Sequence, residues 1–208
     1  DENTSQNEII IVPGACNTIT EAEVASVENV IKECEYVLLQ LEVNQDANER
    51  IVDMANKYGC KVIMNTAPYV PMTDEFLSKC YMVTPNEVEA EEVTGIAVTD
   101  LESAKKAAAY FREKGVTDVV ITLGSRGVFV SSQGREMIVP AYKVDAVDTT
   151  GAGDAFNGGL LAALSEGKEL WDAVKFANAL AALSVQKLGT TPSMPLREEI
   201  DAFLAERE

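Results

Sequence analysis

Short apolar runs rich in β-branched residues alternate with longer amphipathic segments along the chain. The first pattern is typical of strands and the second of helices. The predicted strands cover residues 8–12, 36–41, 61–64, 81–84, 118–122, 127–131 and 136–139. The predicted helices cover residues 20–34, 46–58, 87–94, 101–114, 152–166, 169–187 and 196–206. This alternation predicts an α/β fold of three layers, α/β/α, doubly wound around a mainly parallel sheet.

Local signals refine three of these elements. The run 36–41 is continuously apolar, so we expect a strand buried on both faces. Strands 118–122 and 127–131 are joined by Leu-Gly-Ser-Arg and are predicted to form a hairpin. Thr20 precedes two acids and is predicted to cap the helix over 20–34. The chain has no internal repeat or linker, so we expect residues 1–208 to belong to one domain.

The charge balance narrows the possible partners. Lys and Arg number 17 against 34 Asp and Glu, which leaves a net charge of −17, and histidine is absent. Such a charge disfavours nucleic acid and anionic membranes, although local backbone N–H groups can still bind a small anion. Without histidine, Ser-His-Asp and Cys-His catalysis are excluded. A general base must therefore be Asp, Glu, Lys, Tyr or Cys.

The cysteines and the hydropathy pattern indicate a cytoplasmic protein. Cys16, Cys34, Cys60 and Cys80 are scattered without a C-x-x-C pair, which is typical of reduced thiols rather than of disulfides or a metal site. No apolar run approaches the ~18–20 residues of a membrane span. We therefore expect neither a membrane nor a nucleic acid as partner.

A glycine-rich segment over 148–159, Asp-Thr-Thr-Gly-Ala-Gly-Asp-Ala-Phe-Asn-Gly-Gly, carries the strongest chemical signal. Glycines that open a helix expose N–H groups at its positive end, where an anion can bind. Asp154 would lie beside that anion as a base for an attacking hydroxyl, or would only complement the helix dipole. Phe156 stands where a G-x-G-x-x-G motif needs its third glycine, and no G-x-x-x-x-G-K-[ST] occurs. A Rossmann dehydrogenase and a P-loop enzyme are therefore not supported.

This segment resembles the C-terminal signature of the ribokinase-like carbohydrate kinases. Two further blocks agree in order and spacing, Val-Thr-Pro-Asn-Glu-Val-Glu-Ala-Glu over 83–91 and Ile-Thr-Leu-Gly-Ser-Arg-Gly over 121–127. The tail also agrees, with Pro-Ser-Met-Pro at 192–195 and the segment 197–204. The resemblance implies the ribokinase-like fold and transfer of the ATP γ-phosphoryl group to a primary hydroxyl of a small-molecule sugar. The end-to-end likeness favours the 5-hydroxyl of D-ribose, with fructokinase and nucleoside kinase as alternatives.

The resemblance also implies roles for the glycine-rich segment and for the acid after the second predicted strand. Asp154 is similar to the family's catalytic base, which also contacts the sugar. Gly151, Ala152, Gly153 and Asp154 match the anion hole that holds the transferring phosphoryl group. Glu42 resembles the acid that binds sugar hydroxyls, with one surface acid among many as the alternative.

The positions that resemble the nucleotide and metal sites are spread over four segments. The ATP-binding positions are Asn86, Thr122, Gly124, Ser125, Gly127 and Asn178. Glu89 matches the acid that acts on Mg²⁺ through water. The positions that resemble the monovalent-cation (K⁺) site are Asp148, Thr150, Ser184, Lys187, Gly189 and Ser193.

Each of these segments also has a purely structural interpretation. Asn86 and Glu89 are spaced as a helix capping box. The 121–127 segment is a hairpin loop, Asn178 is an exposed helical residue, and Lys187-Leu-Gly189 is a helix C-cap. For Asn86 and Glu89 the structural and catalytic roles are compatible.

The resemblance begins well inside the family's pattern. We expect the chain to be the C-terminal, ATP-binding portion of one kinase domain, without the N-terminal part and most of the lid, and with residues 1–14 as a residual lid strand. Such a portion is predicted to be inactive by itself, and the complete enzyme is predicted to be a homodimer. The alternative from another class is a non-catalytic nucleotide-binding fragment.

Overall fold

The computed structural model describes residues 12–207. The predicted strand over 8–12 lies outside this range except for Val12, and so does most of the predicted lid strand over 1–14. The first element described is the 3₁₀ helix η1 (Gly14–Thr18).

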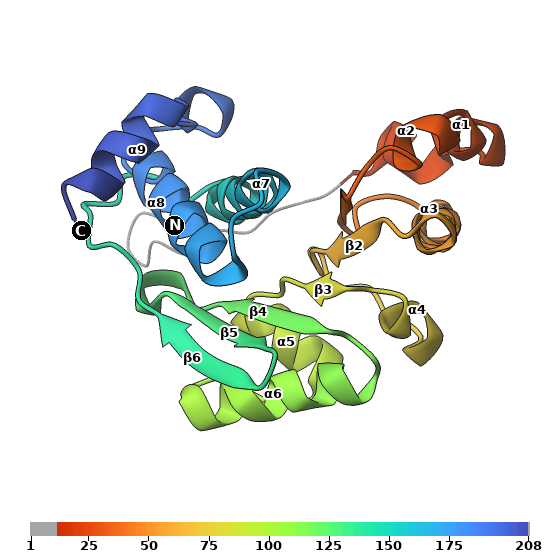
Figure 1. The fold of residues 1–208 in the computed structure, drawn as a ribbon, viewed down its shortest axis with the longest axis horizontal. Helices are drawn as coiled ribbons and strands as arrows, with labels where there is room; N and C mark the ends of the chain where they lie inside the picture. Colours follow the sequence, from red (N-terminus) through yellow and green to blue (C-terminus); the bar gives the residue numbers. More distant parts are fainter. Residues whose placement is uncertain (1–11, 208) are drawn as a thin grey trace.

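The sheet has six strands, and neighbours in the chain are neighbours in space (Figure 1). The parallel strands are β1 (Tyr36–Leu39), β2 (Lys61–Met64), β3 (Met82–Val83) and β4 (Asp118–Thr122). β5 (Val128–Ser132) and β6 (Arg135–Val139) continue the sheet as antiparallel strands. The mainly parallel sheet is confirmed, and so is the hairpin, whose connection contains the 3₁₀ helix η2 (Gly124–Arg126).

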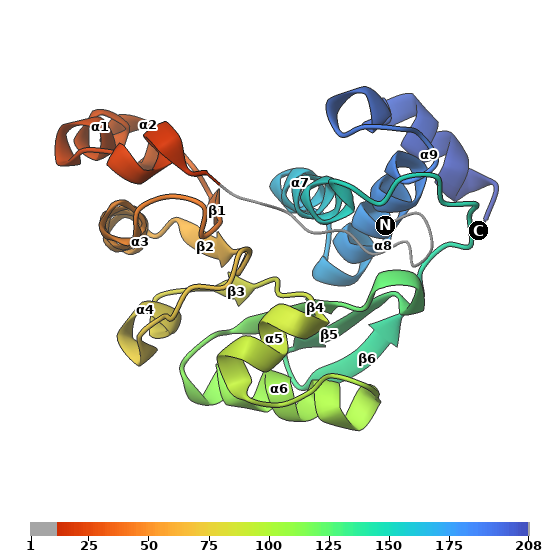
Figure 2. The same ribbon diagram turned by 180° about the vertical axis from the view of Figure 1, so that it is seen from behind.

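Helices cover both faces of the sheet, as Figures 1 and 2 show. α3 (Gln45–Tyr58), α5 (Glu87–Thr94) and α6 (Leu101–Glu113) contribute to one core, together with Phe111, Val119 and Ile121. α7 (Ala152–Ser165), α8 (Leu170–Ser184) and α9 (Arg197–Ala205) contribute to the other, together with Val120. Because side chains alternate along β4, that strand is buried against both helix layers. The predicted three-layer architecture is confirmed.

The helix predicted over 20–34 is wrong as one element. The structure has two short helices, α1 (Glu21–Ser26) and α2 (Glu28–Ile31). The Ser26 hydroxyl donates a 2.6 Å hydrogen bond to the Glu23 carbonyl, a local bond that competes with the regular helical pattern at the junction. Thr20 caps α1 as predicted, and Glu23 completes a capping box with it.

The strand predicted over 36–41 is also shorter and less buried than expected. It ends at Leu39, because the Leu41 N–H donates to the carbonyl of Ala67 in the loop after β2. All four of its residues are half-buried. The physical reason is that β1 is the outer strand of the sheet formed by residues 12–207, so it has a strand neighbour on one side only.

Two further short helices were not predicted, α4 (Asp74–Ser78) and η3 (Thr191–Ser193). Each is a single turn or little more, too short to generate a detectable helical period. Within residues 12–207, no helix has the length and apolar character needed to cross a membrane.

Candidate active site at the carboxyl ends of the strands

The carboxyl ends of the parallel strands bring two of the sequence blocks together. The Thr122 N–H at the end of β4 donates a 2.9 Å hydrogen bond to the carbonyl of Pro85, which follows β3. Asn86 and Thr122 form a parallel β-bridge at the same place. Ligands of open α/β sheets bind at this end of the strands. The 83–91 and 121–127 blocks therefore share one edge of the sheet.

The first turn of α7 is joined to the same edge. The Thr84 hydroxyl donates a 2.7 Å hydrogen bond to Asn157 Oδ1, and both side chains are buried. Asn157 Nδ2 in turn donates to the Gly153 carbonyl at 3.0 Å. These two bonds connect the end of β3 to the start of α7, so the glycine-rich segment lies near the other two blocks.

The α7 N-terminus offers unpaired backbone donors. Gly151 caps the helix in the left-handed conformation, with φ 78°, and no side chain accepts from the first turn. Within residues 12–207, the N–H groups of Gly151, Gly153 and Asp154 have no acceptor, whereas that of Ala152 donates to the Thr149 carbonyl at 3.2 Å. Three of the four predicted anion-hole donors are thus free for an anion in this conformation, and the fourth closes a turn.

Asp154 lies in this turn with its carboxylate exposed. The Asp154 carboxylate makes no hydrogen bond or ion pair with the part of the chain that the structure describes. A Cβ placed on Gly151 would lie 3.8 Å from Asp154 Oδ2 and 3.1 Å from Thr190 Cγ2. A carboxylate is therefore available next to the free N–H groups, and a side chain at position 151 would crowd the space beside it.

Asn86 and Glu89 form the predicted capping box at the start of α5. Asn86 Oδ1 accepts the Glu89 N–H at 2.9 Å, and Glu89 Oε2 accepts the Asn86 N–H at 3.0 Å. Glu89 also accepts bonds from Asn86 Nδ2 at 2.7 Å and from the buried Thr66 hydroxyl at 3.2 Å. Burial raises the pKa of Glu89, partly offset by the Asn86 N–H and the Thr66 hydroxyl, which lower it. Both carboxylate oxygens of Glu89 therefore have protein partners.

The turn over 124–127 is held from two sides. A Cβ on Gly127, which has φ +107°, would lie 2.1 Å from the Val139 carbonyl oxygen, so only glycine fits. Arg126 donates to Glu87 Oε1 at 2.8 Å and to the carbonyl of Thr99. Ser125 is exposed. The turn is therefore fixed to both β6 and α5 with its outer side open.

Asn178 is not the exposed helical residue of the structural interpretation. Its side chain is 7% exposed, and Nδ2 donates to the Pro140 carbonyl at 3.3 Å. The reason is that α8 packs against the loop that leaves β6, so the amide is enclosed between them. Glu42, in contrast, is exposed beyond the end of β1, where Gln40 Nε2 donates to it at 3.3 Å.

The structure brings Asp148, Thr150 and Gly189 together. Asp148 Oδ1 accepts the Thr150 N–H and Oδ2 accepts the Gly189 N–H, both at 2.9 Å. The pKa of Asp148 is lowered, most by the Gly189 N–H and then by Thr150. The hydroxyls of Ser184 and Ser193 are buried and donate to carbonyls within their own turns.

Lys187 points toward α9 rather than toward this group. Its Nζ lies 3.5 Å from Glu199 Oε1, and both side chains are about half exposed. Only its backbone could therefore face an ion near Asp148 in this conformation.

Comparison with known proteins identifies the family of the chain. The family model described as "pfkB family carbohydrate kinase" matches residues 1–197. The chain belongs to the pfkB family of carbohydrate kinases. A ribokinase of Haemophilus influenzae is 44% identical over 201 residues, which are 97% of this chain and 66% of that protein. The chain therefore spans slightly less than two thirds of the length of this pfkB relative.

Solved ribokinase structures superpose closely on the chain. A ribokinase from Thermotoga maritima has a TM-score of 0.84 at 38% identity and covers 98% of this chain and 67% of its own. An Arabidopsis thaliana ribokinase complexed with ribose and ATP has a TM-score of 0.88 at 32% identity. The match covers 97% of this chain and 66% of the Arabidopsis chain. The fold predicted from the family resemblance is thereby confirmed.

The sequence predictions did not single out three residues that organise the candidate site. Thr66 bonds Glu89, Asn157 connects β3 to α7, and Arg126 ties the 124–127 turn to α5. Asn157 lies within the quoted glycine-rich segment, three residues after Asp154, so its place on the first turns of α7 was a usable signal. No sequence signal pointed to Thr66, because its partner Glu89 lies 23 residues away in the sequence.

Proposed function

We propose that this chain carries the ATP-binding and catalytic part of a kinase that transfers the γ-phosphoryl group of ATP to the 5-hydroxyl of D-ribose, giving D-ribose 5-phosphate. The observation that carries the proposal is the start of α7. There the N–H groups of Gly151 and Gly153 are free, and the exposed Asp154 carboxylate lies beside them. Free N–H groups bind and stabilise phosphoryl oxygens, and a neighbouring carboxylate can take a proton.

In the proposed reaction Asp154 accepts the proton of the sugar hydroxyl as that oxygen attacks the γ-phosphorus. The bond between the γ-phosphorus and the oxygen bridging to the β-phosphate breaks, and ADP leaves with that electron pair. The free N–H groups at the start of α7 donate hydrogen bonds to the negative charge on the transferring group. Asp154 then releases its proton to solvent.

The nucleotide would lie along the edge formed by Asn86, Thr122 and the 124–127 turn. This placement of the nucleotide is supported by the β-bridge between Asn86 and Thr122, which puts the 83–91 and 121–127 segments next to each other. Gly124, Ser125 and Gly127 would offer backbone groups there. Asn178 would act by holding the Pro140 loop that borders this turn. Glu42, exposed at the same end of the sheet, is proposed to bind sugar hydroxyls.

The residues fit a hydrated Mg²⁺ better than a directly coordinated one. Both oxygens of Glu89 already accept hydrogen bonds, and no cluster of three or more potential ligand side chains occurs within residues 12–207. Glu89 would therefore hold a water of the ion's shell. Mg²⁺, when bound, supplies positive charge to the phosphate oxygens.

A monovalent cation, K⁺, is proposed beside the anion hole. Asp148 and Thr150 lead directly into α7, and Gly189 is bonded to Asp148. The six proposed positions are Asp148, Thr150, Ser184, Lys187, Gly189 and Ser193, with Lys187 contributing through its backbone. Such an ion would keep the N–H groups of the anion hole in place.

Asp154→Asn tests the proposal, with Asp172→Asn as the matched control. Both acids lie in the first turn of a helix, so a helix-dipole role predicts the same effect for both. With the complete gene product, Asp154→Asn should lower kcat for ribose phosphorylation by roughly two to four orders of magnitude. ATP binding, measured calorimetrically on the 208-residue chain, should persist, because the N–H groups remain.

Turnover of Asp154→Asn equal to that of Asp172→Asn would refute the role of Asp154. ATP binding without phosphorylation of ribose, fructose or a nucleoside by the complete product would indicate a non-catalytic nucleotide-binding protein instead. Fructose or a nucleoside as the preferred acceptor would redirect the substrate assignment. Light scattering on the same product measures the predicted dimer.

A further inference from the structure

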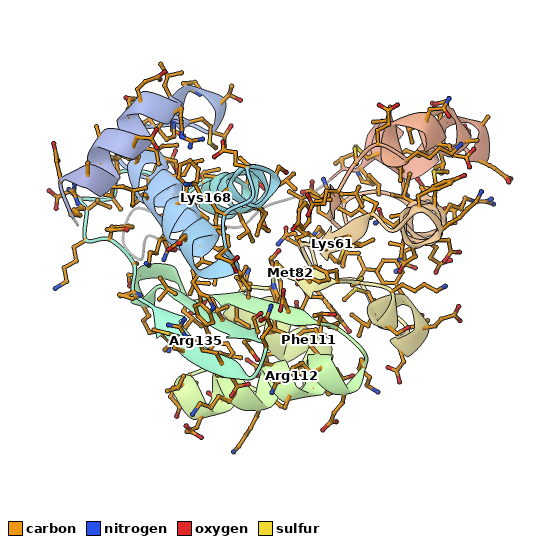
Figure 3. All side chains as sticks on the ribbon, in the orientation of Figure 1. Lys61, Met82, Phe111, Arg112, Arg135 and Lys168 are labelled. Carbon is orange, nitrogen blue, oxygen red and sulfur yellow. The ribbon has the colours of Figure 1, made fainter. Side chains whose placement is uncertain are left out.

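The residue that follows β3 is held from several sides. Thr84 comes directly after β3, whose first residue, Met82, is labelled near the middle of the molecule in Figure 3. The Thr84 N–H donates to the Met64 carbonyl at 2.9 Å, and its carbonyl accepts from Asn65 Nδ2 at 2.8 Å. Its side chain is buried. The Thr84 hydroxyl therefore has a fixed position at the carboxyl end of the sheet, shortly before Asn86 of the proposed nucleotide edge.

The side-chain amide of Asn157 on α7 has one orientation that satisfies both of its partners. Nδ2 lies 3.0 Å from the Gly153 carbonyl, and Oδ1 lies 2.7 Å from the Thr84 hydroxyl. A carbonyl only accepts hydrogen bonds, so Nδ2 must face Gly153 and Oδ1 must face Thr84, whose hydroxyl is then the donor. The side chains of Thr84 and Asn157 are both buried, so bulk water does not compete for these two bonds.

The Gly153 carbonyl belongs to the same planar peptide group as the Asp154 N–H. Fixing the carbonyl oxygen therefore also fixes the direction of that N–H, one of the three free donors of the candidate anion hole. Packing gives Gly153 little support, because a Cβ placed there would meet no neighbouring segment of residues 12–207 within 4 Å. No side chain of the described residues caps this turn either. The hydrogen bond from Asn157 therefore orients the Asp154 N–H.

We propose that Thr84 and Asn157 are positioning residues for phosphoryl transfer, which together keep the Asp154 N–H directed at the transferring group. This inference rests on the proposed function. Both side chains are buried and act through the Gly153–Asp154 peptide group rather than on the substrate. Because Thr84 also leads into Asn86, the same bonds keep the anion hole in a constant place relative to the nucleotide edge. Donors that are held in advance stabilise developing charge without reorganising during the reaction.

A merely structural role for this pair makes a different prediction. Removing one partner of a buried hydrogen bond leaves the other unsatisfied and destabilises the fold, whereas replacing both by apolar groups of similar shape can be nearly neutral. Such a replacement does not restore the orientation of the Gly153 carbonyl, because an apolar side chain has no donor for it. The double variant Thr84→Val with Asn157→Leu therefore separates stability from positioning.

NMR relaxation of the 208-residue chain tests the positioning directly and does not require kinase activity. In the parent chain, the N–H groups of Gly153 and Asp154 should have order parameters of about 0.85, as in rigid backbone. Thr84→Val and the double variant should lower them toward ~0.6. Thr84→Ser keeps the hydroxyl and should give the parent values. Ser131→Ala, which removes a buried hydroxyl from β5, is the control and should also give the parent values.

Ribose phosphorylation by the complete gene product measures the consequence for catalysis. Thr84→Val should lower kcat roughly tenfold, which is less than the roughly 10²–10³-fold cost of losing an anion-hole donor altogether. The KM values for ATP and ribose should stay within about twofold of the parent, because the bond acts on the transition state. Thr84→Ser should recover the parent kcat. The double variant should recover the urea midpoint of the parent and keep the low kcat.

Unchanged order parameters at Gly153 and Asp154 in a folded Thr84→Val variant would overturn the inference. So would a double variant with recovered stability and the parent kcat, or an equal loss of kcat in Ser131→Ala. A parent product that phosphorylates no ribose would refute the proposed function instead. In that case the order parameters of the 208-residue chain still decide whether Thr84 and Asn157 hold the peptide group.

Discussion

Replacing Glu89 by Gln and by Ala separates its structural role from its proposed role toward Mg²⁺. The carboxylate accepts the Asn86 N–H, Asn86 Nδ2 and the Thr66 hydroxyl, and its side chain is 9% exposed. Gln keeps the size of the side chain and one carbonyl oxygen to accept the Asn86 N–H. Ala removes every acceptor and leaves the Thr66 hydroxyl buried without its partner.

The expected free-energy changes follow from these bonds. Loss of the capping interaction costs ~1 kcal/mol, and a buried donor left unsatisfied costs ~1–3 kcal/mol. Glu89→Ala should therefore lower the free energy of unfolding by about 2–4 kcal/mol, whereas Glu89→Gln should stay within ~1 kcal/mol of the parent. Urea denaturation of the 208-residue chain at neutral pH measures both variants. Equal losses for Gln and Ala would refute this account of the capping box.

The pH dependence supplies a second check. Burial raises the pKa of Glu89 above its ordinary value of 4.5, so between the two pKa values the folded chain binds more protons than the unfolded chain. The contribution of Glu89 to stability is then complete below its unfolded pKa and is lost as the pH rises through the folded pKa. The parent chain should therefore lose stability relative to Glu89→Gln as the pH is raised above about 4.5. A constant difference between pH 4 and pH 7 would contradict the buried position of this carboxylate.

The Glu89→Gln variant also tests the proposed role of Glu89 toward Mg²⁺. If Glu89 holds a water of hydrated Mg²⁺, Glu89→Gln should weaken the Mg²⁺-dependent part of ATP binding roughly tenfold, the lower end of the range for outer-shell partners of metals. Binding of ATP without Mg²⁺ should change little. Retention of the full Mg²⁺ dependence in this stable variant would leave Glu89 with the capping role alone.

Two further predictions follow from backbone geometry and from the group around Asp148. Gly127→Ala should lower the free energy of unfolding by roughly 2–5 kcal/mol, because positive φ and overpacking against the Val139 carbonyl add. Urea denaturation measures this loss of stability. A loss below ~1 kcal/mol would contradict the close approach of a Cβ at position 127 to the Val139 carbonyl oxygen. Asp148→Ala should abolish the extra kinase activity of the complete gene product in K⁺ over tetramethylammonium at matched ionic strength. Reduced stability with unchanged preference for K⁺ would limit Asp148 to its bonds with Thr150 and Gly189.

Short-range interactions made part of this protein predictable from the sequence alone. The capping box of Asn86 and Glu89 joins residues three positions apart, so residue type and spacing were enough to predict it. The same holds for α7, whose start at Ala152 follows from the single glycine before it, Gly151. The order and type of most strands and helices were predictable because each hydrophobic period is a property of a few neighbouring residues.

Only the tertiary structure decided which of these segments meet and which polar groups are buried. The Thr84–Asn157 bond joins residues 73 positions apart, and the Asp148–Gly189 bond spans 41. The sequence left Asn178 open as an ATP contact or an exposed helical residue, and the structure buries it, because the loop leaving β6 packs over α8. The sequence predicts Asp118 only as the first residue of a strand. Its burial depends on packing by α7, α8 and the neighbouring strands, which no local pattern around residue 118 records.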